Sequence, residues 1–93
     1  MTLMKTLAAT AFLILAIAAC GKTPAQGCAD LCTGAGFSDN NLDEQPNELN
    51  CFCTGGTGAV SDEACTTMCT DLGKSNAEAF SSTGGENNSC QCS

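Results

Sequence analysis

Cysteine is the residue type in this chain that can do chemistry, and its spacing is repeated. The 93 residues include nine cysteines. A CxxxC pair followed by a CxC pair occurs twice, first as Cys28, Cys32, Cys51 and Cys53 and then as Cys65, Cys69, Cys90 and Cys92. As thiolates, such pairs can hold zinc or copper. As oxidised pairs, they form disulfides, so the sequence raises both kinds of chemistry.

The two spacings indicate which elements must position the cysteines. Positions i and i+4 lie on one face of a helix, and positions j and j+2 lie on one face of a strand. One helical turn rises about 5.4 Å and two strand residues rise about 6.6 Å. Two parallel disulfides can therefore clip a helix onto a strand with little strain.

The N-terminal residues have the pattern of an export signal. Residues 6–19 form an uncharged apolar run that follows Lys5, as in the n-region and h-region of a signal peptide. A permanent transmembrane anchor is the alternative, but the run is shorter than the roughly 20 apolar residues that span a bilayer. We expect residues 1–19 to be a signal peptide.

The junction Ile17-Ala18-Ala19-Cys20 resembles the lipobox of bacterial lipoproteins. This resemblance implies acylation of Cys20 and attachment of the mature chain to a lipid bilayer in the bacterial cell envelope. Gly21, in place of Asp, favours the outer membrane if the cell is Gram-negative. The alternative is an ordinary signal peptide whose Cys20 pairs elsewhere. Without Cys20, however, eight cysteines remain, and these pair off evenly.

The expected mature chain, residues 20–93, is acidic and poor in core-forming residues. It retains two lysines and all ten acids, and it has no Arg, His, Trp or Tyr. Such a surface repels phosphate backbones, so we expect no nucleic-acid partner. A domain this small relies on cross-links, or staples, such as disulfides, and exported thiols are oxidised. We therefore favour disulfides over metal binding and expect no metal and no cofactor.

Turn and capping residues divide the mature chain into two similar stretches, and the helices of these stretches are expected to start at the capping residues Thr23 and Ser61. Each is expected to form a helix, a strand, a turn and a second strand, with an offset of 37 residues between the helix cysteines (65 minus 28). Asp39–Asn47 is expected to be an exposed acidic loop. The expected division is a signal peptide (1–19), a lipidated tether (20–27), a first unit (28–54), a flexible glycine-rich linker (55–60) and a second unit (61–93).

The cysteine pattern, with Gly36 and Gly73 four residues after the second helix cysteine, resembles the cysteine-stabilised αβ fold of defensins and scorpion toxins. The resemblance covers nearly all of the mature chain. It implies a small disulfide-rich α+β fold with two tandem units and the pairs Cys28–Cys51, Cys32–Cys53, Cys65–Cys90 and Cys69–Cys92. Both units lack the third disulfide of that family, and the chain is acidic where defensins are usually basic. The resemblance therefore concerns the scaffold and not the function.

Two further groups of residues are candidates for a site. The acids Asp39, Asp43 and Glu44 can pair as acid and base or bind calcium, but there is no His and the DxDxDG order is missing. We expect a solvated acidic segment and no catalytic residues. Phe52 lies between two strand cysteines and is expected to face away from the helix. We favour packing of Phe52 against the second unit or the linker, and the alternative is an exposed anchor for a partner protein.

The sequence therefore predicts a non-enzymatic, membrane-anchored lipoprotein that acts as a defensin-like binding module, with a protein partner at the envelope or cell surface. Two alternatives remain. One is a structural envelope lipoprotein without a dedicated ligand. The other is an inhibitor of a protease or of a competitor's protein, which requires a rigid exposed loop, with Asp39–Asn47 as the candidate.

Overall fold

The computed structural model describes residues 22–93, in which each of two helices is followed by two strands. The expected signal peptide and its lipidation site, Cys20, lie outside the described residues. The elements are α2 (Pro24–Gly34), β1 (Phe37–Gln45), β2 (Glu48–Gly56), α3 (Asp62–Asp71), β3 (Ala77–Phe80) and β4 (Ser89–Cys92). None of the described helices is long and apolar enough to cross a membrane.

Both helices begin at the residues that the sequence indicated. The Thr23 hydroxyl accepts a hydrogen bond from the Gln26 amide at 3.2 Å, and the Gln26 side chain accepts one from the Thr23 amide at 3.0 Å. At α3, the Ser61 hydroxyl accepts from the Ala64 amide at 3.0 Å. These bonds satisfy donors that a helix start otherwise leaves free.

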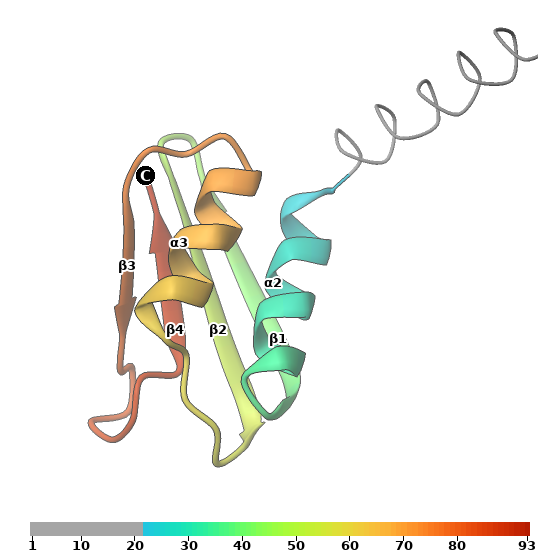
Figure 1. Cartoon of the computed structure of the whole chain (residues 1–93), viewed down its shortest axis with the longest axis vertical. Helices are drawn as coiled ribbons and strands as arrows, with labels where there is room; N and C mark the ends of the chain where they lie inside the picture. Colours follow the sequence, from blue (N-terminus) through green and yellow to red (C-terminus); the bar gives the residue numbers. More distant parts are fainter. Residues whose placement is uncertain (1–21) are drawn as a thin grey trace, which may run out of the picture.

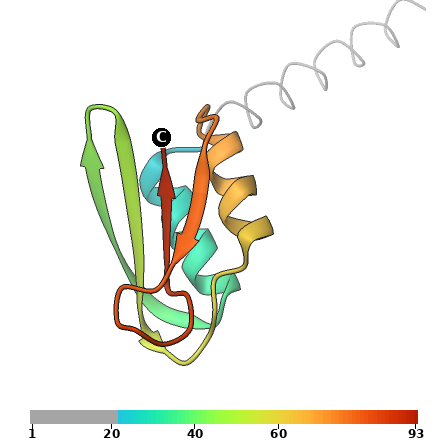
Figure 2. The same cartoon turned by 90° about the vertical axis from the view of Figure 1, so that its left-hand side faces the viewer.

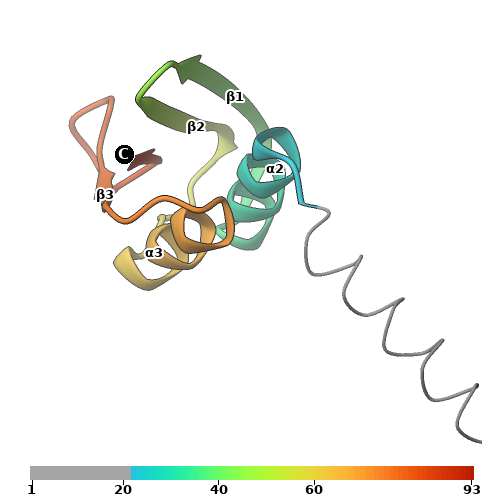
Figure 3. The same cartoon turned by 90° about the horizontal axis from the view of Figure 1, so that it is seen from above.

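The four strands form one antiparallel sheet in the order β1-β2-β4-β3. Both helices cover the same face of this sheet (Figures 1 and 2), and they lie side by side and run in opposite directions (Figures 1 and 3). The fold is therefore the small disulfide-rich α+β structure that the sequence predicted, with two similar units. The strands of the two units join into one sheet through β2 and β4.

The two units are related by an approximate two-fold axis. The strand cysteines of the second unit follow those of the first by 39 residues (90 minus 51), and these equivalent residues, Cys51 and Cys90, lie directly opposite each other in the β2–β4 pair. Leu49 faces Cys92 on one side, and the Cys53 amide donates to the Asn88 carbonyl at 2.8 Å on the other. Equivalent residues meeting at one point are the mark of an isologous contact, here formed within one chain.

The expectation of an exposed loop at Asp39–Asn47 was wrong. Residues up to Gln45 belong to β1, which pairs with β2 over nearly its whole length. Only Pro46 and Asn47 remain as a turn. β1 is an edge strand with mostly exposed residues, and such a strand can be as polar as a loop. Composition therefore could not separate the two.

The glycine-rich segment is also more ordered than its composition suggests. Gly55 and Gly56 lie in β2. A Cβ on Gly58 would overlap the Ala35 carbonyl oxygen, so the chain crosses from one unit to the other in close contact with the end of α2. Val60, which follows, is only 2% exposed and belongs to the core.

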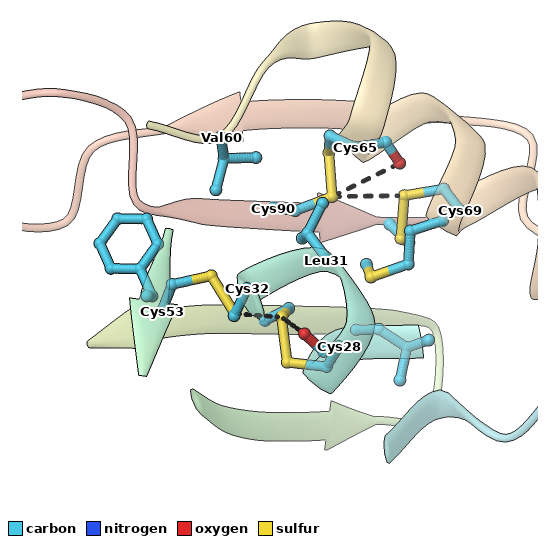
Figure 4. Packing of buried hydrophobic residues seen from close by; sticks show 13 residues of the cluster. Cys28, Leu31, Cys32, Cys53, Val60, Cys65, Cys69 and Cys90 are labelled. Carbon is cyan, nitrogen blue, oxygen red and sulfur yellow. Dashed lines mark hydrogen bonds between the residues drawn. A yellow bond between two sulfur atoms is a disulfide. The ribbon is translucent and has the colours of Figure 1, made fainter. Parts of the chain in front are cut away.

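The core is one cluster shared by both units, and cysteine sulfur makes up much of it. The eight cysteines of residues 22–93 are at most 1% exposed. They pack with the five buried residues Leu31, Phe37, Leu49, Val60 and Met68 (Figure 4). A chain with few large apolar side chains thus fills its interior with disulfides.

Candidate functional site

The cysteines form four disulfides, and each one joins a helix to a strand of its own unit. The pairs are Cys28–Cys51, Cys32–Cys53, Cys65–Cys90 and Cys69–Cys92, as the resemblance implied. In the first unit, the two disulfides approach to 3.6 Å between the sulfurs of Cys32 and Cys51. Cys69 and Cys90 repeat this distance in the second unit.

These sulfur clusters are also the places where a metal would have to bind. Within residues 22–93, the sulfurs of Cys28, Cys32 and Cys51 lie within 4.8 Å of one another, and their counterparts in the second unit do the same. All of them are in disulfides here. Thiolate, not disulfide sulfur, is the zinc and copper ligand, so the oxidised clusters serve as staples.

The acids that could have formed a catalytic or calcium site do not converge. Asp39 and Asp43 lie on the sheet face opposite the helices, whereas Glu44 points to the other face because neighbouring strand residues alternate. Asp43 accepts a hydrogen bond from the Gln45 side chain at 2.9 Å, and Asp39 accepts one from the Asn40 amide at 2.8 Å. These contacts are local and join no third acid.

Phe52 contacts the second unit, which is the interpretation that the sequence favoured. Its ring meets that of Phe80 edge to face, with 6.2 Å between centroids. Ser89 of β4 lies in register between the two residues and is fully buried. The aromatic pair therefore covers the β2–β4 junction on the face that has no helix. Both rings remain partly exposed.

A groove between α2 and α3 is the feature that sequence reasoning missed. It has a volume of about 360 Å³, at the low end of the range of small-molecule sites, about 300–1,000 Å³. Leu31 and Met68 contribute the large apolar side chains of its lining, and most of the other lining residues are small or charged. All four disulfides join the helices that form it to the sheet.

The groove lies on the approximate two-fold axis. Ten of its twelve lining residues form five pairs separated by 37 residues, the offset between the helix cysteines, namely Lys22 and Ala59, Gly27 and Ala64, Asp30 and Thr67, Leu31 and Met68, and Gly34 and Asp71. The 37-residue offset was visible in the sequence. Applied to the two expected helices, this offset makes these positions equivalent, but nothing in the sequence shows that the two helix faces meet.

Comparison with known proteins gives no relative for this chain. No family model, no curated protein and no solved structure matches it.

Proposed function

We propose that the chain is a secreted lipoprotein, anchored in the bacterial envelope through acylated Cys20, that acts as a non-enzymatic binding module with a protein partner. The groove between α2 and α3 is the observation that carries this proposal. It is lined by both units, and four disulfides fix the helices on either side. A preformed groove on a rigid scaffold binds without a large ordering cost.

The anchor is supported by the sequence around Cys20. The lipobox-like residues precede it, and the other eight cysteines pair among themselves, so Cys20 is not needed for a staple. Lys22 begins the described part of the chain next to the groove. The described part of the chain therefore starts beside one end of the proposed binding surface.

A non-enzymatic role fits the available side chains. The chain has no His, its described cysteines are oxidised, and Asp39, Asp43 and Glu44 divide between two faces of the sheet. The inhibitor alternative relied on a loop at Asp39–Asn47, and that segment is a strand followed by a two-residue turn. The scaffold resembles two cysteine-stabilised αβ units that share a sheet, which is consistent with a defensin-like module.

Two measurements test the anchor and the binding role separately. The wild-type protein should partition into detergent after expression in a bacterium, and Cys20→Ser should abolish this behaviour. An unmodified Cys20 at the mature N-terminus, seen by mass spectrometry, would contradict the anchor. For the binding role, immobilised oxidised Cys20→Ser protein should retain a stoichiometric envelope protein that the reduced and alkylated form does not retain. Equal retention by both forms would contradict a folded binding module.

A further inference from the structure

The groove between α2 and α3 has a charged end and a neutral end. Because the helices are antiparallel, the first turn of α2 lies beside the last turn of α3 (Figure 1). A Cβ on Gly27 would lie 3.4 Å from the side chains of Met68 and Leu72. Lys22 and Asp71 therefore share one end of the groove. The other end, where Gly58 contacts Ala35, is lined by small neutral residues.

The charges at the first end are not balanced. The Lys22 ammonium lies 3.4 Å from the Asp30 carboxylate. Asp71 has no ion-pair partner within residues 22–93. These residues carry ten acids and two lysines, a net charge of −8. The charged end of the groove thus has one carboxylate available to a cation, in a field that favours cations.

The middle of the groove is suited to an apolar side chain. Leu31 and Met68 are only 7% and 5% exposed, and both line the groove, where they form its apolar middle. Met adapts its shape to different partners. Beyond them, a Cβ on the lining residue Gly34 would lie in open space, with nothing within 4 Å, so this position can take a larger side chain.

We propose that the groove binds a short segment of a partner protein in which a Lys or Arg stands next to an apolar side chain. The cation pairs with Asp71, and the apolar side chain covers Leu31 and Met68. This inference rests on the proposed binding function and names the chemistry of the partner. A volume of about 360 Å³ accommodates a few side chains.

Charge and size disfavour the other occupants. A second copy of this chain also carries −8 over the same residues, and two such surfaces repel each other. Anionic lipid headgroups and nucleic acids are repelled for the same reason. A two-chain lipid exceeds a groove at the lower limit of small-molecule sites.

The test is an NMR titration of the oxidised, isotope-labelled Cys20→Ser protein with the peptide acetyl-Ala-Leu-Lys-Leu-Ala-amide. The peptide should shift the amide signals of the groove residues in a saturable way. A matched peptide with norleucine in place of Lys should bind several-fold more weakly, because it lacks the cation. Phosphatidylcholine vesicles provide the lipid arm and should leave these signals unchanged.

Three variants separate the groove from general electrostatics. Gly34→Phe places a large side chain at a lining position that has room for it and should weaken peptide binding at least about tenfold. Asp71→Asn should weaken it by about 2–5-fold, the range for an exposed ion pair. Asp43→Asn removes the same charge from the opposite sheet face and should change the affinity less than about twofold. If Gly34→Phe alters the circular dichroism spectrum, Ala64→Leu, at a groove position of α3, replaces it.

The inference is overturned if the peptide does not bind at millimolar concentration, if Asp71→Asn and Asp43→Asn weaken binding equally, or if the vesicles shift the groove signals. Each of these results leaves the retention of an envelope protein by the oxidised chain unaffected. A failure of the inference is therefore distinguishable from a failure of the proposed function.

Discussion

The two units of this molecule share their helices and staples but differ in their hairpins. In the first unit, β1 and β2 are nine residues each and are joined by Pro46 and Asn47. In the second, β3 and β4 are four residues each and are joined by residues 81–88. The disulfides nevertheless span similar separations of 21 to 25 residues. The staples thus fix where a helix meets its strand and leave the hairpin length free.

Removing one disulfide, from either the first or the second unit, should have the largest effect. We expect the double variants Cys28→Ala with Cys51→Ala and Cys65→Ala with Cys90→Ala each to lose about 3 kcal/mol of unfolding free energy, because the loops that they open are nearly equal. Denaturant unfolding measures this loss.

The consequences of these two double variants for local structure should differ between the units. Hydrogen exchange should show that the long β1–β2 hairpin keeps its protection without its staple, whereas β3 and β4 lose theirs. Equal loss in both hairpins would show that the length of a hairpin does not decide how much it depends on its disulfides. Mapping should still find both native disulfides of the first unit in the Cys65 and Cys90 variant.

The crossing between the units should be the next most sensitive place. Gly58→Ala places a methyl group against the Ala35 carbonyl, and we expect a loss of about 1–3 kcal/mol of unfolding free energy from this overpacking. Gly85→Ala is the control, because a Cβ there meets nothing within 4 Å. A Gly58→Ala variant as stable as the control would show that the crossing is a loose linker.

The aromatic pair on the helix-free face should couple the units more weakly. A double-mutant cycle with Phe52→Ala and Phe80→Ala should give a coupling energy of about 1 kcal/mol, as for other edge-to-face pairs. Thermal or denaturant unfolding of the four proteins supplies the numbers. Additive effects would mean that the two rings stabilise their own units independently.

The smallest effect concerns the helix starts. Gln26→Ala leaves Thr23 in place but removes the acceptor for its amide, so the start of α2 becomes like that of α3, where Ala64 occupies this position. We expect a loss of about 0.5 kcal/mol of unfolding free energy. No measurable change would mean that the reciprocal bond adds nothing to the Thr23 cap.

Local sequence signals predicted the parts of the structure that depend on local physics. The helix starts at Thr23 and Ser61 follow from capping chemistry, and the cysteine spacings follow from helix and strand periodicity. The pairing itself came from the resemblance to a known scaffold. β1 was missed because an exposed edge strand of Asp and Asn has the composition of a loop.

The contacts between the units could not be predicted from the sequence. Pairing of β2 with β4 depends on backbone hydrogen-bonding groups that every strand offers, so no pattern of side chains indicates it. The groove was missed for the same reason, since it exists only because two helix faces meet. Phe52 was the one local clue, because an aromatic side chain on the strand face away from the disulfides favours another residue that covers it.

Nicking the chain between the units tests whether two locally stapled units form one body through β2 and β4. A protease site is inserted after Thr57, which is exposed, and the oxidised protein is cleaved and chromatographed with and without denaturant. We expect the fragments to elute together under native conditions and to separate in denaturant without reductant. Fragments that stay joined in denaturant would reveal a disulfide between the units. Fragments that separate under native conditions would show that the shared sheet does not hold the units together.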